Sequence, residues 1–188
     1  MQVISVNLAA ACATVINGRR VMTAIAKRPV EGAVTVKPLG LEGDEQADLS
    51  VHGGITKAIY AYPHEHYAFW QTVRAQARVS LWDDALPPGT LGENLTVEGL
   101  LEEQLWIGDR LRLPNCVLAV SEPRFPCFKF NAAMGFGHAS KMMVQSGYCG
   151  SYLAVIEPGT VSAGEAIELL PGPREVGLRE LFRDRARA

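Results

Sequence analysis

Short runs rich in Val, Ile, Leu and Tyr, each ended by turn-forming residues, recur along almost the whole sequence. Such runs are typical of β-strands, because branched and aromatic side chains pack well on a pleated surface. Many short strands joined by Gly, Pro, Asn and Asp turns favour a mainly β fold that closes into a barrel. The runs span residues 2–8, 20–27, 33–39, 57–62, 109–114, 116–122, 152–157 and 165–170.

Three other segments have the spacing of helices. Residues 63–79 begin with Pro63, which suits a first helical turn, and continue with apolar residues at helical intervals. Residues 138–147 end in Gly147, a frequent helix terminator, and residues 174–188 form a short basic tail with a helical pattern. We therefore expect a few helices beside the strands.

No Pro/Gly/Ser-rich linker divides the 188 residues, so we expect one domain over residues 1–188. No apolar run approaches the roughly 18 residues that a membrane span needs, and no basic segment precedes the N-terminal apolar residues as in a signal peptide. These features predict a cytoplasmic protein without a membrane partner. The formal net charge of -2 argues against general binding to nucleic acid polymers, which requires a surplus of Lys and Arg.

The four cysteines, Cys12, Cys116, Cys127 and Cys149, are far apart and form no C-x-x-C pair. This spacing argues against a structural zinc site and, in a reducing compartment, against a disulfide framework. Each cysteine is therefore considered separately. Cys12 and Cys116 lie among apolar or small residues, and we expect both to be structural.

Cys127 has a different local sequence, SEPRFPCFKF at residues 121–130. It follows Pro126 directly and lies between Arg124 and Lys129. Two interpretations are open. Most free cysteines are small buried hydrophobes, but nearby cations favour the thiolate, which attacks electrophiles and binds soft metals.

Gly53, Gly54 and Lys57 form a glycine-rich entry to the run at 57–62. Adjacent glycines let backbone N–H groups turn toward a ligand, so the segment is either an anion cradle or an ordinary turn. A second loop, LGENLTVEGL at residues 91–100, places Asn94 as a turn residue or a ligand contact. Because a rigid scaffold can bring separate loops together, we expect Cys127, Lys57 and Asn94 to face one pocket.

Four motifs in this order, GLEGDEQADLSVHGGITKAIYAYPHEHYAFW, LGENLTVEGL, IGDRL and EPRFPCFK, closely resemble the MOSC family, the molybdenum cofactor sulfurase C-terminal domains. The resemblance covers about residues 2–170 and is strongest with bacterial single-domain members linked to detoxification of N-hydroxylated bases. It implies a closed or partly closed, pyruvate kinase barrel-like β-barrel that holds a molybdopterin-type molybdenum cofactor. It also implies that Cys127 is the metal ligand and catalytic residue, and that the cofactor contacts Lys57, His52, Gly53, Gly54, Asn94, Arg124 and Lys129.

Two functions of different kinds follow from the resemblance. The first is a molybdenum-dependent oxidoreductase that reduces N-hydroxylated compounds, such as hydroxylaminopurines, with electrons from a donor still to be identified. The second is a carrier, without turnover, that delivers the cofactor or its sulfur. Both need Cys127, both involve a labile cofactor that purified protein can lose, and both suit a monomer or a homodimer.

Overall fold

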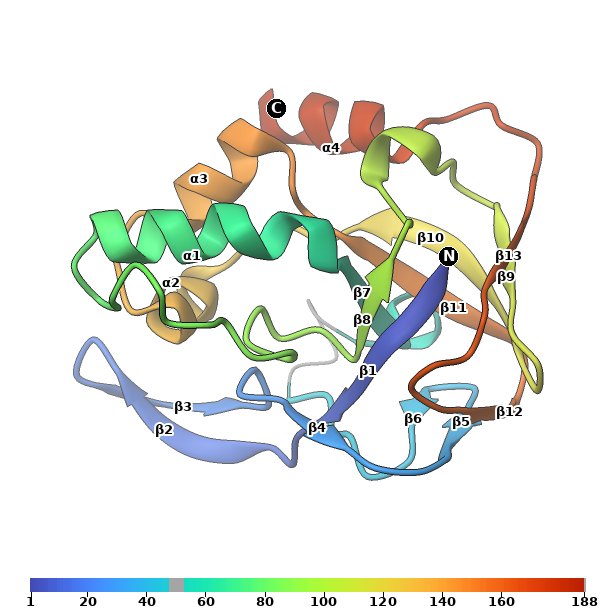
Figure 1. Ribbon diagram of the computed structural model, residues 1–188, viewed down its shortest axis with the longest axis horizontal. Helices are drawn as coiled ribbons and strands as arrows, with labels where there is room; N and C mark the ends of the chain where they lie inside the picture. The colour runs from blue at the N-terminus through green and yellow to red at the C-terminus, as the bar shows by residue number, and fades with distance from the viewer. Residues whose placement is uncertain (48–52, 188) are drawn as a thin grey trace.

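The computed structural model describes residues 1–47 and 53–187 and is mainly β with a few helices, as expected (Figure 1). The main sheet pairs its strands in the order β13-β9-β10-β11-β7-β8-β1-β4. All of these pairs are antiparallel except β7 with β8, which is parallel. In chain order the strands are β1 (Gln2–Leu8), β4 (Arg28–Val30), β7 (Ile59–Pro63), β8 (Leu95–Glu98), β9 (Arg110–Arg112), β10 (Val117–Pro123), β11 (Ser151–Glu157) and β13 (Glu168–Leu170).

Two smaller groups of strands lie apart from the main sheet. One has the order β12-β5-β6, built from Gly159–Val161, Val34–Lys37 and Gly40–Leu41. The other is a hairpin of β2 (Cys12–Ile16) and β3 (Arg19–Thr23). Its two-residue turn is Asn17–Gly18, and both residues have positive φ, 51° and 75°, as a tight turn matched to the twist of the strands requires.

The sheet curls so that the segment before β13 reaches β1. The Val3 N–H donates to the Glu165 carbonyl at 2.9 Å, and the Gly164 N–H donates to the Val3 carbonyl at 2.7 Å. Among the described strands, no ladder joins the edge strands β13 and β4. The predicted mainly β fold is confirmed.

Helices occur in all three predicted segments, and three further short elements were not predicted. The segments at 63–79, 138–147 and 174–188 contain the 3₁₀ turn η2 (His64–His66) with α1 (Tyr67–Gln76), then α3 (Ala139–Ser146) and α4 (Leu178–Arg187). The sequence patterns did not predict α2 (Phe128–Met134) or two further 3₁₀ turns, η1 (Ile55–Lys57) and η3 (Glu102–Gln104). Among the residues that the structure describes, none of the helices is long and apolar enough to cross a membrane.

Several strand predictions were too long, most clearly those at 20–27 and 165–170. The run at 20–27 leaves the sheet after Thr23, because the Lys27 N–H donates to the Ile25 carbonyl in a tight turn. The run at 165–170 pairs as a strand only from Glu168. In both places an apolar sequence continues past the end of the ladder.

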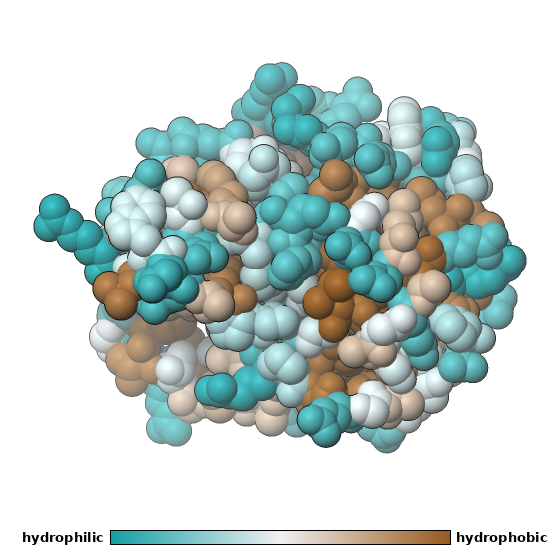
Figure 2. Space-filling model, in the orientation of Figure 1, coloured by the Kyte–Doolittle hydropathy of each residue, from teal (hydrophilic) through white to brown (hydrophobic). Residues whose placement is uncertain are grey.

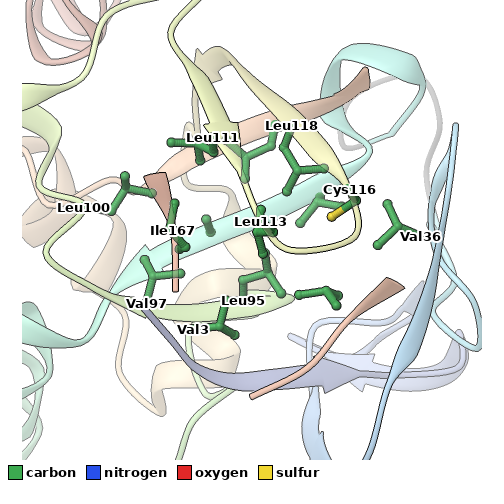
Figure 3. Packing of buried hydrophobic residues seen from close by; sticks show 14 of the residues in the cluster. Val3, Val36, Leu95, Val97, Leu100, Leu111, Leu113, Cys116, Leu118 and Ile167 are labelled. Carbon is green, nitrogen blue, oxygen red and sulfur yellow. The ribbon is translucent and has the colours of Figure 1, made fainter. Parts of the chain in front are cut away.

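The main apolar core lies inside the curved sheet, where side chains from β1, β8, β9 and β10 meet (Figure 3). Leu95, Leu111 and Leu118 are almost fully buried there, and each such side chain contributes about 1.5–3 kcal/mol by leaving water. Cys116 points into the same core, which confirms its structural role. Cys12, in contrast, is exposed on β2.

A second, aromatic cluster fixes the helices against the sheet. Trp70 of α1 donates from Nε1 to the Tyr62 hydroxyl at 2.6 Å and meets the Phe130 ring of α2 edge to face, with centroids 5.3 Å apart. All three side chains are fully buried. The start of α2, next to Cys127, is therefore held by packed rings.

Candidate functional site

Loops that are far apart in the sequence meet at one cavity of about 90 Å³. This geometry follows from the sheet. Asn94 directly precedes β8, and η1 precedes β7. Because β7 and β8 are parallel, both lie at the end of the sheet where these two strands begin. The end of β10 lies close by, since Tyr152 of β11 pairs with Tyr60 on one side and Glu122 on the other. The cavity wall contains Lys57, Asn94, Arg124, Cys127 and Lys129, so the predicted shared pocket is confirmed.

Cys127 lies between the end of β10 and the first residue of α2, with a half-buried side chain. Its backbone is extended, at φ -127° and ψ 176°. Its carbonyl accepts the Phe130 N–H at 2.9 Å and the Ser140 hydroxyl at 3.2 Å. The thiol therefore sits on a backbone that α2 and α3 hold in place, while part of its surface remains accessible from the cavity.

Arg124 is a buried cation in the wall of the cavity, only 5% exposed. Its guanidinium lies over two aromatic rings, 4.9 Å from the centroids of Tyr60 and Phe130, and also has a hydrogen bond with the Tyr152 side chain. Within residues 1–47 and 53–187, no carboxylate forms an ion pair with it. A buried charge is costly without a counter-charge, although cation–π contacts offset part of that cost. The site therefore suits an anionic ligand.

Lys57 ends η1, and its ammonium faces the cavity wall. Its Nζ is 3.8 Å from the Glu122 Oε2 and 5.9 Å from the centroid of the Tyr152 ring. The same carboxylate oxygen is 3.6 Å from Nη1 of Arg185 in α4. The Glu122 carboxylate thus lies within ion-pair distance of two cations.

The glycines before Lys57 do not form a backbone cradle at this cavity. Gly54 has φ 93°, but its N–H donates to the Gln46 side chain at 2.9 Å, and neither Gly53 nor Gly54 lines the wall. Gln46 lies in the wall instead. His52 lies outside the described residues.

Asn94 lines the cavity, yet its amide already has partners within the protein. Its Oδ1 accepts the Tyr60 N–H at 3.1 Å, and its Nδ2 donates to the Asp44 carboxylate at 2.8 Å. That carboxylate also pairs with the Lys27 ammonium, and both side chains are almost fully buried. Asn94 therefore joins β7 to an ion pair in the cavity wall.

Lys27, the cation of that ion pair, is a cavity residue that the sequence patterns did not predict. Its side chain lines the cavity, and burial lowers the pKa of the Lys27 ammonium, while the Asp44 charge opposes this shift. Its position directly before Arg28 and Pro29 in an apolar run resembled the end of a strand. No local signal distinguished it from a surface lysine.

Glu93, next to Asn94, holds the same loop together from behind. It is fully buried, and its carboxylate accepts hydrogen bonds from the Tyr67 hydroxyl, the Gly89 N–H at 2.7 Å and the Thr96 hydroxyl at 2.8 Å. Burial raises the pKa of Glu93, and these hydrogen bonds oppose that shift. The residue stabilises the loop without reaching the cavity.

Lys129 reaches from α2 to the hairpin, where its Nζ donates to the Met22 carbonyl of β3 at 2.8 Å.

Burial raises the pKa of Tyr60 and of Tyr152, so both phenols stay protonated at the cavity wall. The wall therefore combines one thiol, several ammonium or guanidinium groups and neutral hydroxyls.

The donor set fits the metal end of a cofactor that brings its own ligands. Among the described residues, no group of three or more His, Cys, Asp and Glu side chains could hold a metal ion. A metal bound by Cys127 here would therefore need its remaining ligands from a non-protein group, and an anionic group would match Arg124 and Lys57. The cavity is only about 90 Å³, so the rest of a large cofactor would lie outside it.

Separate loops of a mainly β scaffold thus gather a thiol and several cations at one cavity, an arrangement whose chemistry suits an anionic small molecule or cofactor. The chain belongs to the MOSC domain family, whose family model matches residues 48–168. It is 42% identical over 168 residues to the uncharacterized protein YflK of Bacillus subtilis, covering 89% of this chain and 72% of that one.

Two further proteins extend the comparison. A reductase of Gibberella moniliformis is 34% identical over 157 residues, which cover 83% of this chain but 27% of that protein. The crystal structure of YiiM from Geobacillus stearothermophilus is similar in fold, with a TM-score of 0.77 and 27% identity, over 98% of this chain and 83% of that one.

Proposed function

We propose that this protein binds a molybdopterin-type molybdenum cofactor at the Cys127 cavity and reduces N-hydroxylated compounds such as hydroxylaminopurines. One observation carries the proposal: the half-buried thiol of Cys127 shares a cavity with Arg124, a buried cation that pairs with no carboxylate of the described residues. A thiolate is a suitable ligand for a soft metal, and a guanidinium binds phosphate or dithiolene charge well. Membership of the MOSC family and the similarity to a fungal reductase support the same function.

Each residue has a chemical role in this proposal. The Cys127 sulfur would hold the metal, and Arg124, Lys57 and Lys129 would offset the negative charge of the cofactor. Reduction of a hydroxylamine, R–NHOH, to an amine breaks the N–O bond, consumes two electrons and two protons, and releases water. When bound, such a cofactor supplies the two-electron chemistry, which an external donor must replenish. The Lys27 ammonium holds a proton at the wall where the N–O oxygen would leave.

We extend the proposal to the setting of the reaction. The protein would act in the cytoplasm, as a single domain that is a monomer or a homodimer and that binds no nucleic acid polymer. The curled sheet would be a partly closed barrel. A carrier that only delivers the cofactor would need the same thiol and cations, so turnover is what separates an enzyme from a carrier.

The test is to produce wild type, Cys127→Ser and Cys12→Ser in a host that makes the cofactor. Serine is nearly isosteric with cysteine but is a harder, less acidic ligand, so Cys127→Ser should lose molybdenum and pterin without a large loss of stability. Cys12→Ser is the matched control for molybdenum and pterin content, because Cys12 lies outside the wall of the Cys127 cavity. Metal analysis and pterin fluorescence measure content, and conversion of 6-hydroxylaminopurine with an artificial electron donor measures turnover. Equal molybdenum content in Cys127→Ser and wild type would remove Cys127 from the metal, and a loaded protein without turnover would favour the carrier.

A further inference from the structure

An apolar groove of about 370 Å³ lies between α2 and the tip of the β2–β3 hairpin. Ile16, Phe128 and Phe136 make its wall apolar, and none of the described residues in the wall is charged. Phe128 keeps 50% of its surface exposed. Figure 2 shows hydrophobic residues around a hollow at the lower left of the molecule, above the hairpin. Exposed apolar surface of this kind is typical of a protein-binding site.

The surroundings of this groove are cationic. Arg19 and Arg20 are exposed at the start of β3, and Arg19 pairs with Ile16 in the ladder of the hairpin. The sequence has no Asp or Glu in residues 12–30 or 123–156, the two stretches that contain the hairpin and α2. In the part of the chain that the structure describes, neither arginine forms an ion pair. An acidic partner would supply the complementary charge.

The turn after α1, residues 81–84, has the opposite charge and the same apolar character. Leu81 and Trp82 are 68% and 65% exposed, and the exposed carboxylates of Asp83 and Asp84 follow them directly. The Asp84 carboxylate accepts the Leu81 N–H at 2.7 Å, and the Gln71 side chain of α1 donates to the Trp82 carbonyl at 2.9 Å. The turn is therefore held in shape while its two large apolar side chains remain in water.

The turn and the groove are neighbours at one end of the molecule. A Cβ at Gly135, in the wall of the groove, would lie 3.5 Å from the Cβ of Val79, two residues before the turn. Figure 1 shows the segment after α1, the hairpin tip and α2 together at the left. Because Trp82 remains exposed, the turn does not fill the groove of its own chain. Two adjacent complementary surfaces let a second copy bind both at once about a two-fold axis, and this assembly closes at two chains.

We propose that this protein is a homodimer in which the turn at 81–84 of each copy occupies the groove of the other, with Asp83 close to Arg19 and Arg20. Apolar surface and charge are complementary at the same two places, so both point to the same occupant. Tryptophan and arginine are enriched among the residues that dominate interface affinity, and a turn already held in shape loses little freedom on binding. The interface covers Phe128, the first residue of α2. This inference is independent of the proposed function.

The test is sedimentation equilibrium of the full chain between low-micromolar and sub-millimolar concentrations, where wild type should dimerise reversibly. Trp82→Ala removes the contact from the turn, and Gly137→Trp fills the groove, at a position where an added Cβ meets no atom within 4 Å. Each variant should weaken the dimer by about thirtyfold for each of its two turn–groove contacts. Leu39→Ala is the matched control, because Leu39 is 60% exposed but belongs to neither surface, and this variant should dimerise like wild type.

A mixture of the two variants distinguishes this arrangement from any other dimer. Trp82→Ala keeps an intact groove and Gly137→Trp keeps an intact turn, so a mixed dimer regains one of the two contacts. Mixing should therefore restore association that neither variant shows alone. Urea unfolding confirms that the variants are folded, and Arg20→Glu, at an exposed position beside the groove, replaces Gly137→Trp if that variant does not fold. A wild type that stays monomeric would overturn the proposal, and so would a dimer that Trp82→Ala leaves unchanged or a mixture that associates no better than its components.

Discussion

Substitution of Phe182 by alanine tests whether the C-terminal helix α4 belongs to the folded core. Phe182 is fully buried, and its ring stacks on the ring of Phe125 with centroids 4.9 Å apart and an interplanar angle of 28°. Phe125 lies two residues before Cys127 in the sequence. The Leu178 N–H at the start of the helix also donates to the Leu105 carbonyl at 2.9 Å. The helix therefore packs against the segment that presents the thiol.

The structure sets the size of the effect. Truncation of a buried phenylalanine to alanine costs about 3–5 kcal/mol, because apolar contact is lost and a cavity remains. In a protein of this size each kcal/mol lowers the melting temperature by about 2–4 °C, so Phe182→Ala should lower it by about 6–20 °C. Arg183→Ala on the exposed face of the same helix should change stability by less than about 0.5 kcal/mol.

Two measurements check this prediction. Urea unfolding gives the stability difference, with an unchanged denaturant dependence as the sign that both variants unfold in the same way. In a Cys12→Ser background, the rate at which a thiol reagent modifies Cys127 reports on its segment, and Phe182→Ala should raise that rate. A stability loss below about 1 kcal/mol, with an unchanged modification rate, would show that α4 is an appendage.

Two further predictions concern single side chains. Lys57→Ala should weaken retention of the cofactor during dialysis by about ten- to a hundredfold, the value of one charge-assisted hydrogen bond, and Lys57→Glu should weaken it more. The measurement is the pterin content of the purified proteins, and the control is Lys37→Ala, because Lys37 lies in an exposed pair with Glu42. Equal pterin content in Lys57→Glu and wild type would refute this prediction. Burial raises the pKa of the Cys116 thiol to about 11 from an ordinary value of 9.0, so its protonated form stabilises the fold fully below pH 9, and this contribution is lost as the pH rises through 11. The stability difference between wild type and Cys116→Ala should therefore shrink by about 2–3 kcal/mol between pH 8 and pH 12 in urea unfolding, and a constant difference would contradict it.

The sequence predicted the longer elements because their patterns are local. Runs such as 2–8 and 116–122 carry enough branched and aromatic residues to indicate a strand, and α3 ends at Gly147 in the left-handed conformation that glycine allows. Elements of two or three residues, such as β6 and β12, contain too few residues for any period to be visible. The α2 helix is seven residues long and starts directly after Pro126–Cys127, which indicated a loop.

The missed hairpin had a signal that could have been used. Asn17–Gly18 is a strong two-residue turn signal, and the β-branched residues Thr14, Val15 and Ile16 come directly before it. Recognition of that turn would have paired Cys12–Ile16 with Arg19–Thr23 and shortened the predicted run at 20–27. The turn alone would not have revealed the cavity of about 470 Å³ that the hairpin lines, because the opposite wall comes from residues 87–90 and from α2.

Asn94 shows why the roles of site residues are harder to predict than their location. The sequence left two interpretations, a turn residue or a ligand contact, and the structure shows a third arrangement. Both ends of the amide are occupied, one by the Tyr60 backbone and the other by Asp44, whose carboxylate pairs with Lys27. Asn94 is thus at the cavity, as predicted, but it acts on the cavity by fixing the carboxylate that holds a lysine. The residues of that chain lie at positions 27, 44 and 94, on segments joined only by the tertiary fold, so no local pattern could relate them. The Lys27 ammonium is one of the cations that line the cavity, and the asparagine determines where that ammonium is held.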